Sequence, residues 1–198
     1  MFLLETIKLQ NQQLQNIHWH NQRLNRTREL LFGATNEWDL NQIIKIPSDL
    51  TNEIYKCRVT YGLTIEKVAF ELYSPKLIKT LKIIHHNTID YSCKYANRST
   101  LHALYAQKEN CDDILIVKNG LITDTYYCNI AFFDGKNWLT PEEPLLKGTQ
   151  RGFLLSKNII QTAKIGVQDL KNFQYFKVFN ALMNWKEQEK QKIKTHVY

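Results

Sequence analysis

Residues 114–133 read ILIVKNGLITDTYYCNIAFF, and this stretch decides how the second half of the chain folds. Asn119-Gly120 is a strong signal for a tight β-hairpin turn, because both residues tolerate the positive φ angles that such turns need. The pair separates an apolar run, Ile114–Val117, from a longer strand-like run, Ile122–Phe133. Asp134-Gly135 then marks another turn. The pattern predicts a domain built around a hairpin.

Helix signals lie on both sides of this hairpin. A helix is expected over Asn97–Gln107, and a second over Thr149–Lys157, where Gly148 precedes the apolar periodicity. Three shorter elements complete the second half: an extended segment at Tyr91–Tyr95, a helical turn at Val167–Lys171 and a buried strand at Phe176–Ala181.

The first half predicts a small α/β lobe. His18–Phe32 is expected to be a helix, because Leu24, Leu30 and Leu31 lie on one side and Gly33 supplies a stop. The other expected elements are strands at Met1–Lys8, Ile54–Tyr61, Val68–Tyr73 and Leu81–His86, and a short helix at Asp39–Ile46 that Pro47 ends. We expect an α/β (α+β) protein of two lobes, residues 1–88 and 89–198.

The charge of the chain suggests an anionic partner. The 198 residues carry a formal net charge of +7, which suits nucleic acid, a phosphorylated cofactor or a carboxylate substrate. Part of the excess comes from Lys186, Lys190, Lys192 and Lys194, a run expected to be a solvated tail. Since no RNA- or DNA-binding motif accompanies the run, no nucleic-acid partner is expected.

Cysteine usage points to a reducing compartment. None of the four cysteines forms a CxxC pair and no signal peptide precedes them, so a cytoplasmic location is expected. Neither the cysteines nor the histidines show zinc-ligand spacing, so no metal is expected. No apolar run approaches the roughly 20 residues of a membrane span, so no membrane partner is expected.

Four motifs carry the chemistry, and they occur in an order typical of one family. They are Lys94-Tyr95-Ala96-Asn97-Arg98, then Asn119–Asp124 with Cys128-Asn129-Ile130, then Thr140-Pro141 with Leu145–Arg151, and, earlier in the chain, His20–Leu24. Together they resemble the class IV (fold type IV) enzymes of pyridoxal phosphate (PLP), which include aminodeoxychorismate lyase and the branched-chain and D-amino acid aminotransferases. The resemblance runs from Glu5 to about Met183.

The resemblance implies that Lys94 is the catalytic residue and forms an imine with PLP, which would lie in the cleft between the lobes. A partly buried lysine beside a cation loses its proton more readily than an exposed one. Arg98 is a candidate for that cation, and also for a partner of the cofactor's phenolic oxygen. By the expected boundary near Thr88, Lys94 belongs to the C-terminal lobe.

The resemblance assigns Asp124 to the pyridine nitrogen of PLP, where a carboxylate keeps the ring protonated and makes it a better electron sink. The family usually has Glu at this position, and Asp is one methylene shorter. We therefore expect a closer backbone, a bridging water or a weaker sink. Because family members usually carry a further segment before the strand that Glu5–Lys8 matches, a shortened N-terminal lobe is also expected.

The remaining matched residues are expected to hold the cofactor's phosphate and ring. Arg23 would grip the phosphate with two bonds, because a planar guanidinium matches phosphate geometry. Helix N-termini suit anions, so the turn at Gly148 would offer the amides of Thr149 and Gln150. Leu146 would pack on the ring face, and Asn180 and Ala181 would complete the phosphate cup. His20 is expected to be a structural hydrogen-bonding residue.

Several functions remain open. The Lys-x-x-Asn-Arg form at Lys94 and the Asn-Ala-Leu-Met segment at Asn180 favour a lyase that releases pyruvate from 4-amino-4-deoxychorismate and leaves 4-aminobenzoate, a step of folate biosynthesis. The alternative is a branched-chain or D-amino acid aminotransferase. Two further alternatives are a basic nucleic-acid-binding protein without chemistry and a family member that binds PLP without useful turnover. The resemblance also implies a homodimer.

Overall fold

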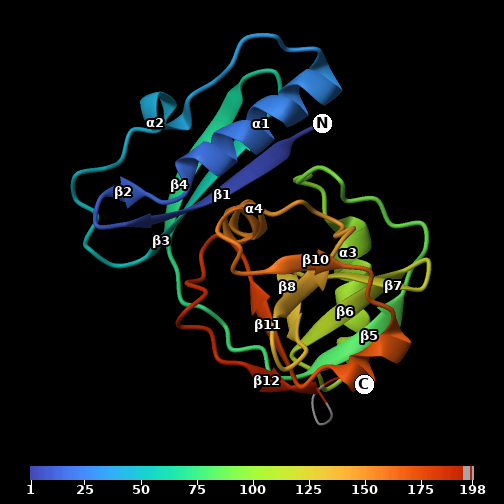
Figure 1. Ribbon diagram of the computed structural model, residues 1–198. Coiled ribbons are helices and arrows are strands. Elements are labelled where there is room, and N and C mark those ends of the chain that lie inside the picture. The colour runs from blue at the N-terminus through green and yellow to red at the C-terminus, as the bar shows by residue number, and fades with distance from the viewer. Residues whose placement is uncertain (194–196, 198) are drawn as a thin grey trace. The chain divides into compact units, whose positions relative to one another are not determined.

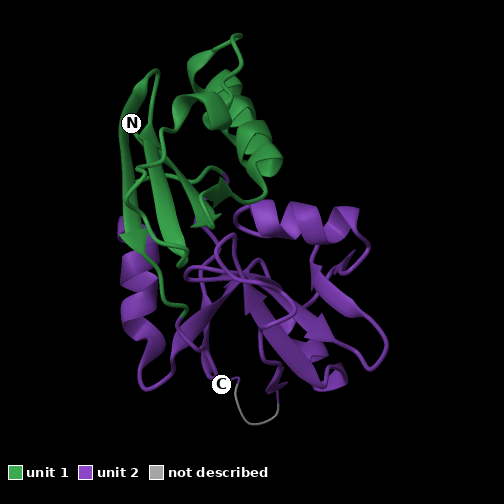
Figure 2. Ribbon diagram, turned by 90° about the vertical axis from the view of Figure 1, so that its left-hand side faces the viewer, with its two compact units in different colours: residues 1–75, 93–97 green, residues 76–92, 98–198 purple. Residues whose placement is uncertain are grey.

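The computed structural model describes residues 1–193 and 197 of the chain. The chain forms two compact units, shown in different colours in Figure 2. Unit 1 comprises residues 1–75 and 93–97, and unit 2 comprises residues 76–92 and 98–198.

Unit 1 contains a four-stranded antiparallel sheet in the order β2-β1-β3-β4 (Figure 1). Its strands are β1 (Leu3–Gln10), β2 (Gln13–Leu14), β3 (Tyr55–Tyr61) and β4 (Ile65–Leu72). Residues alternate between the two faces of a strand, so Leu3, Glu5, Ile7 and Leu9 of β1 share one face, and all four are buried. A carboxylate therefore lies in the middle of an apolar row.

Helix α1 (Ile17–Phe32) covers that face of the sheet. Its Leu24 packs in one core cluster with Leu3 and Ile7 of β1. The helix ends at Gly33, which has φ 65° and donates its N–H to Glu29 O at 3.0 Å, as the sequence predicts. The helix α2 (Leu40–Ile43) is shorter than the expected Asp39–Ile46.

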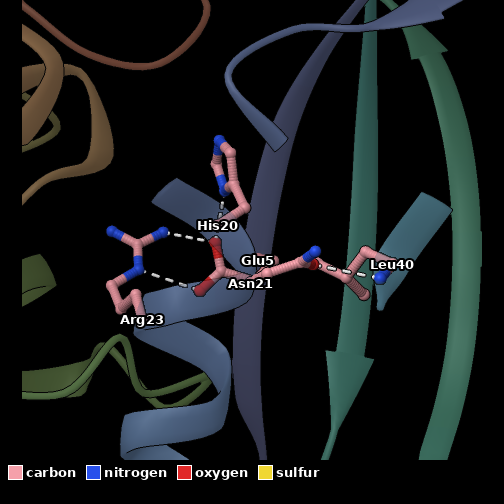
Figure 3. A network of polar contacts seen from close by, with 5 residues as sticks. All are labelled: Glu5, His20, Asn21, Arg23 and Leu40. Carbon is pink, nitrogen blue, oxygen red and sulfur yellow. Dashed lines mark hydrogen bonds and ion pairs between the residues drawn. The ribbon is translucent and has the colours of Figure 1, made fainter. Parts of the chain in front are cut away.

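Asn21 joins the two helices of unit 1 (Figure 3). Its Oδ1 accepts the N–H of Leu40 at 3.0 Å, and its Nδ2 donates to Asp39 Oδ1 at 2.8 Å. The Asp39 side chain also accepts the N–H of Asn41, which caps α2. These bonds fix the start of α2 against the middle of α1.

A short segment from later in the chain completes unit 1. Residues 93–97 run beside the start of β1, where Leu4 N donates to Lys94 O and Ala96 N to Phe2 O, both at 2.9 Å. An isolated antiparallel bridge pairs Leu3 with Tyr95. The segment therefore behaves as an extra strand on the edge of β1 that β2 leaves open.

Unit 2 contains two sheets. One is three-stranded, in the order β5-β6-β7, and the other is five-stranded, in the order β10-β9-β8-β11-β12. Their strands are β5 (Leu81–His85), β6 (Asp113–Lys118), β7 (Leu121–Thr125), β8 (Asn129–Phe133), β9 (Trp138–Pro141), β10 (Gln161–Ala163), β11 (Tyr175–Phe179) and β12 (Gln191–Lys192). The pairs β5–β6 and β9–β10 are parallel, and the others are antiparallel.

One core cluster joins the two sheets of unit 2. It contains Leu115 of β6, Ile122 of β7 and Phe132 of β8. The opposite face of the five-stranded sheet packs against α4 (Thr149–Ser156), since Ala131 of β8 and Leu154 of α4 share a second cluster. The other helical elements are α3 (Ser99–Tyr105) and 3-10 turns at Ala106–Lys108 and Val167–Asn172.

The structure differs from the predicted elements in the long strand expected at Ile122–Phe133. The strand is interrupted after Thr125, because Thr125 N donates to Cys128 O at 2.9 Å and Cys128 N donates to the Thr125 hydroxyl at 3.1 Å. These bonds close a turn at residues 126–128. The chain passes there from the three-stranded sheet to the five-stranded one, and Asp124 and Asn129 lie on either side of the turn.

The division into units also differs from the boundary expected near Thr88. Residues 76–88 pack with unit 2, because β5 pairs with β6. Residues 93–97 pack with unit 1, because they pair with β1. Lys94 therefore belongs to unit 1, together with the N-terminal sheet, and not to the unit that contains the hairpin.

The segment that contains the C-terminal lysines was expected to be a solvated tail, but it packs in unit 2. Trp185, Gln191 and Ile193 are buried, and β12 pairs with β11. Lys186, Lys190 and Lys192 are exposed, and Lys190 lies 4.2 Å from the ring centroid of Tyr175. The lysines therefore lie on the outside of a packed segment, because their neighbours Trp185, Gln191 and Ile193 are buried. Lys194 lies outside the described residues.

Candidate functional site

Glu5 and two side chains of α1 form a buried polar network in unit 1 (Figure 3). His20 Nδ1 lies 2.5 Å from Glu5 Oε2. Arg23 donates from Nε to Glu5 Oε1 at 2.8 Å and from Nη2 to Oε2 at 2.5 Å. His20 and Arg23 are three residues apart on α1 and therefore lie on the same face. The paired bonds fix the plane of the Arg23 guanidinium.

The three groups of this network set one another's protonation. Burial raises the pKa of Glu5, but the charge of Arg23 and the hydrogen bonds from His20 and Arg23 outweigh burial and hold the pKa at about 2. Burial lowers the pKa of His20 below its ordinary value, and Glu5 offsets this only in part. We infer a neutral imidazole whose Nδ1–H donates to the ionised carboxylate. His20 is thus a hydrogen-bonding residue of the buried network.

Lys94 lies close to this network. Its carbonyl oxygen pairs with the N–H of Leu4, the residue before Glu5, and the residue as a whole is half-buried. The positive charges of Arg23 and Lys94 both contribute to the lowered pKa of His20. Unit 1 therefore brings together Lys94 and Arg23, which are far apart in the sequence, around one buried carboxylate.

In unit 2, Asp124 lies at the end of β7 with its carboxylate buried. Its Oδ1 accepts the Asn129 Nδ2–H at 2.7 Å, and its Oδ2 accepts the N–H of Leu146 at 2.9 Å. Both donors are neutral amides. The backbone N–H of Leu145 also donates to this carboxylate. A carboxylate has about four lone-pair sites, so the three donors leave capacity for a further one.

Burial raises the pKa of Asp124 to about 7, because it disfavours the charged form. The hydrogen bonds from Leu146 and Asn129 and the charge of Arg151 lower the pKa, but they do not overcome burial. A buried carboxylate with neutral partners gains free energy from a cation brought into contact with it. Asp124 is therefore suited to a ligand that carries a positive charge or a proton donor.

The turn before α4 lies next to Asp124, because Leu146 contacts both Asp124 and Asn129 through its backbone. Gly148 precedes the helix, and the buried residues Thr149 and Gln150 begin it. The first N–H groups of a helix have no partner within the helix, and its dipole favours anions there. Unit 2 thus brings Asp124, expected at the ring nitrogen, next to Gly148, Thr149 and Gln150, expected at the phosphate, whereas Arg23 lies in unit 1.

Asn180 and Ala181 follow β11. Asn180 Oδ1 accepts the N–H of Leu182 at 2.9 Å, and its Nδ2 lies 3.4 Å from Cys128 Sγ. These bonds hold the turn after β11 against the start of β8. The phosphate contacts expected for Asn180 and Ala181 stay predictions.

The Arg98 guanidinium lies among tyrosines in unit 2. Its Nη2 donates to Tyr126 O at 2.5 Å, and its Cζ lies 4.4 Å from the ring centroid of Tyr126 and 5.0 Å from that of Tyr127. Arg98 therefore stabilises the turn that follows Asp124. Its two expected roles, beside Lys94 or beside the phenolic oxygen of the cofactor, stay predictions.

Two polar residues of these arrangements have no assigned role in the sequence analysis: Glu5 and Asn129. Glu5 could have been found, because it interrupts the apolar alternation of Leu3, Ile7 and Leu9, and a charge on a buried face needs a partner. Asn129 stands in the matched segment Cys128-Asn129-Ile130, but the motif gave it no role. Its contact with Asp124 depends on the interruption of the predicted strand, which places the two residues on either side of the turn.

Comparisons with known proteins agree with the fold and the motifs. The model of the family "Amino-transferase class IV" matches residues 3–186. A protein of Haemophilus influenzae, whose name assigns no function, is 37% identical over 182 residues, which cover 91% of this chain and 97% of that protein.

Two solved structures illustrate the range of the family. One, from Haemophilus somnus, is provisionally assigned as a 4-amino-4-deoxychorismate lyase. It is 31% identical, with a TM-score of 0.84 over 91% of this chain and 96% of that one. The other, a provisionally assigned aminotransferase of Mycobacterium tuberculosis in its PLP-bound form, is 16% identical, with a TM-score of 0.74 over 99% of this chain and 81% of that one.

The expected fold type IV is confirmed, since the mixed α/β structure matches these proteins along almost its whole length. Among the described residues, no helix has the length and apolar composition that crossing a bilayer requires. The family match spans nearly the entire chain, and it includes every motif from which the resemblance was inferred. The chain therefore belongs to the class IV aminotransferase family and is an enzyme of this PLP-dependent class of lyases and aminotransferases.

Proposed function

We propose that this chain binds PLP and releases pyruvate from 4-amino-4-deoxychorismate, leaving 4-aminobenzoate. The main observation in support of PLP as the cofactor is Asp124, a buried carboxylate with neutral partners and a pKa raised to about 7. The similarity to the provisionally assigned Haemophilus somnus lyase supports the reaction, together with the lyase-like segments at Lys94 and Asn180.

The chemistry of the available groups fits PLP. The cofactor presents a ring nitrogen that takes a proton, an aldehyde that reacts with an amine, and a phosphate. Asp124 is suited to the protonated nitrogen, and the half-buried Lys94 supplies the amine. Arg23, whose plane Glu5 fixes, and the start of α4 are suited to the phosphate.

The remaining proposed contacts come from the turns of unit 2. Leu146 would pack on the ring, and Gly148, Thr149 and Gln150 would offer backbone N–H groups to the phosphate. Asn180 and Ala181 would close the phosphate cup from the turn after β11. Arg98 would hold the Tyr126 turn behind Asp124.

When bound, PLP supplies an electron sink that stabilises negative charge on the substrate carbon bearing the amine. Lys94 Nζ would hold the cofactor until the substrate amine replaces it, and would then be placed to take the proton from that carbon. Breaking the carbon–oxygen bond would release enolpyruvate, which takes up this proton to become pyruvate, and would leave an aromatic ring. Asp124 would keep the proton on the ring nitrogen.

The cofactor assignment is tested by absorbance. Purified protein with PLP should be yellow, and borohydride should bleach the colour and leave the cofactor attached to Lys94 in a mass spectrum. Lys94→Ala should remain unlabelled, whereas Lys67→Ala, which removes an exposed lysine of β4, should behave like the wild type. Covalent labelling of Lys94→Ala would refute the role of Lys94.

The reaction is tested with the substrate itself. The holoenzyme should release pyruvate and 4-aminobenzoate from 4-amino-4-deoxychorismate in equal amounts. An amino acid that converts the cofactor to its amine form, with reversal by an oxo-acid, would instead establish an aminotransferase.

That aminotransferase, of branched-chain or D-amino acid type, is the second candidate. Lys94 would then move the proton from the substrate carbon to the cofactor carbon. The family includes such enzymes, and the fold of the Mycobacterium tuberculosis aminotransferase is similar.

We further propose a homodimer in the cytoplasm. The dimer rests on the family, and light scattering at several concentrations tests it. The cytoplasmic location is inferred from the state of the cysteines. All four are thiols, which is typical of a reducing environment: Cys57, Cys93, Cys111 and Cys128. Titration with a thiol reagent after unfolding should find four thiols without added reductant.

A further inference from the structure

We propose that Asn129 is a positioning residue that locks the carboxylate of Asp124 to the turn before α4. This proposal deepens the proposed function and rests on it, because Asp124 and the turn are its residues for the ring nitrogen and the phosphate. Asn129 itself contacts neither group of the cofactor in this proposal. It acts through its neighbours.

The amide of Asn129 makes two hydrogen bonds from one nitrogen. Its Nδ2 donates to Asp124 Oδ1 at 2.7 Å and to Leu146 O at 2.9 Å. Leu146 N donates to the other carboxylate oxygen, Asp124 Oδ2, at 2.9 Å. Asp124, Asn129 and Leu146 therefore form a closed ring of three hydrogen bonds, which fixes the plane of the carboxylate.

The oxygen of the same amide lies against the backbone of Gly148. A Cβ atom built on Gly148 would overlap Asn129 Oδ1, so a larger residue there requires the amide to move. An exposed side-chain end could rotate away at little cost. Asn129 cannot, because rotation would break both bonds of its Nδ2 to Asp124 and Leu146. Gly148, whose φ is −66°, is required here by space and not by its backbone conformation.

The shorter side chain of Asp124 gives this arrangement its importance. Where the family usually has Glu, a flexible carboxylate can adjust to the ring by rotating an extra bond. Asp124 has one rotatable bond fewer, so its position depends on what holds it. Because Asn129 links it to Leu146 and Gly148, the distance between the ring-nitrogen partner and the phosphate turn is fixed before the cofactor binds.

The first test uses the apoprotein and needs no cofactor. Melting temperatures are measured for Gly148→Ala, Asn129→Ala and the double variant. Gly148→Ala should lower the melting temperature in the wild type, but by less than half as much in the Asn129→Ala background, because the overlapping oxygen is gone. Asn129→Ser provides a second background that also removes this oxygen while keeping a polar group.

The matched control is Gly62→Ala in unit 1. A Cβ atom there would lie 3.4 Å from its nearest neighbour, which is an ordinary contact. Its effect on the melting temperature should be the same in the wild type and in the Asn129→Ala background. Equal costs of Gly148→Ala in the wild-type, Asn129→Ala and Asn129→Ser backgrounds would overturn the lock.

The second test measures PLP affinity by titration of the visible absorbance. Asn129→Ala should weaken the affinity at least tenfold, and the pH dependence of the absorbance should shift because Asp124 loses a fixed donor. Unchanged affinity and pH dependence would overturn the positioning role. If the wild type itself forms no coloured complex, the proposed function fails, while the apoprotein cycle still decides whether the lock exists.

Discussion

Glu5 in unit 1 and Asp124 in unit 2 are both buried carboxylates, and their pKa values are shifted in opposite directions. The pKa of Glu5 in unit 1 is held at about 2, whereas that of Asp124 in unit 2 is raised to about 7. Burial acts in the same direction on both. The difference is the partner: Glu5 contacts the guanidinium of Arg23, whereas the hydrogen-bond donors to Asp124 are neutral amides.

The two carboxylates differ in whether the protein itself supplies a cation to balance their charge. The charge of Glu5 is balanced within the protein by Arg23. Among the described residues no cation contacts the carboxylate of Asp124, and burial raises its pKa to about 7. A ligand with a proton on a ring nitrogen would supply such a cation. The first carboxylate thus has a charged partner in the protein, and the second has only neutral ones.

The largest expected effect is that of Glu5→Gln. It leaves the Arg23 guanidinium beside a neutral amide in a buried setting, and breaking a buried ion pair from one side costs about 3–5 kcal/mol. Urea unfolding of the apoprotein at pH 7 measures the loss. Because the folded pKa of Glu5 lies below its ordinary value of 4.5, the contribution is present above that pH and is lost as the pH falls towards 2. A loss below 1 kcal/mol would contradict this account.

The opposite pH dependence is expected for Asp124. Its folded pKa is raised above the ordinary 3.8, so the folded state binds the proton more tightly and its contribution declines as the pH rises from about 4 to about 7. A shift of this size corresponds to roughly 4 kcal/mol at most. The difference in unfolding free energy between Asp124→Asn and wild-type apoprotein should therefore move in favour of the variant over this range. A flat difference would show that Asp124 titrates normally.

A smaller effect is expected for His20→Ala. It removes one hydrogen bond to a charged group, which is typically worth about 1.5–3 kcal/mol, but leaves the Arg23 pair in place. His18, which is exposed on the same helix, provides the control, since His18→Ala should change stability by less than about 0.5 kcal/mol. Equal effects of the two variants would remove His20 from the network.

The smallest effect is expected where the same kind of ion pair is exposed. Lys56 Nζ lies 2.6 Å from Glu71 Oε2 between β3 and β4, with 22% and 55% of the two side chains exposed. Such pairs contribute about 0.2–1 kcal/mol, so Glu71→Gln should cost no more than that, and less in high salt. Urea unfolding measures the loss of unfolding free energy for Glu71→Gln and for Glu5→Gln. The difference between the two losses shows how much burial adds to the effect of breaking an ion pair.

Most of the fold was predictable because its signals are local. The helix that Gly33 ends and the Asn119-Gly120 turn follow from the sequence, and motif resemblance placed Asp124 and Gly148 in one site. Interactions between distant residues were not predictable. The strand-like run continued through residues 126–128, whereas in the structure the hydroxyl and backbone bonds of Thr125 close a turn there. Lys94 belongs to unit 1 because its backbone pairs with Leu4, and no sequence pattern near Lys94 predicts this pairing.

The pairing of residues 93–97 with β1 has a consequence for the order of folding. Leu4 and Lys94 meet across almost half of the chain, and the chain visits unit 2 over residues 76–92 before it returns. Contacts between residues so distant in sequence form late, because loop closure must precede them. On a ribosome, Glu5, His20 and Arg23 emerge long before Lys94. The residues of the charge-balanced network are therefore available to pair before Lys94 has emerged.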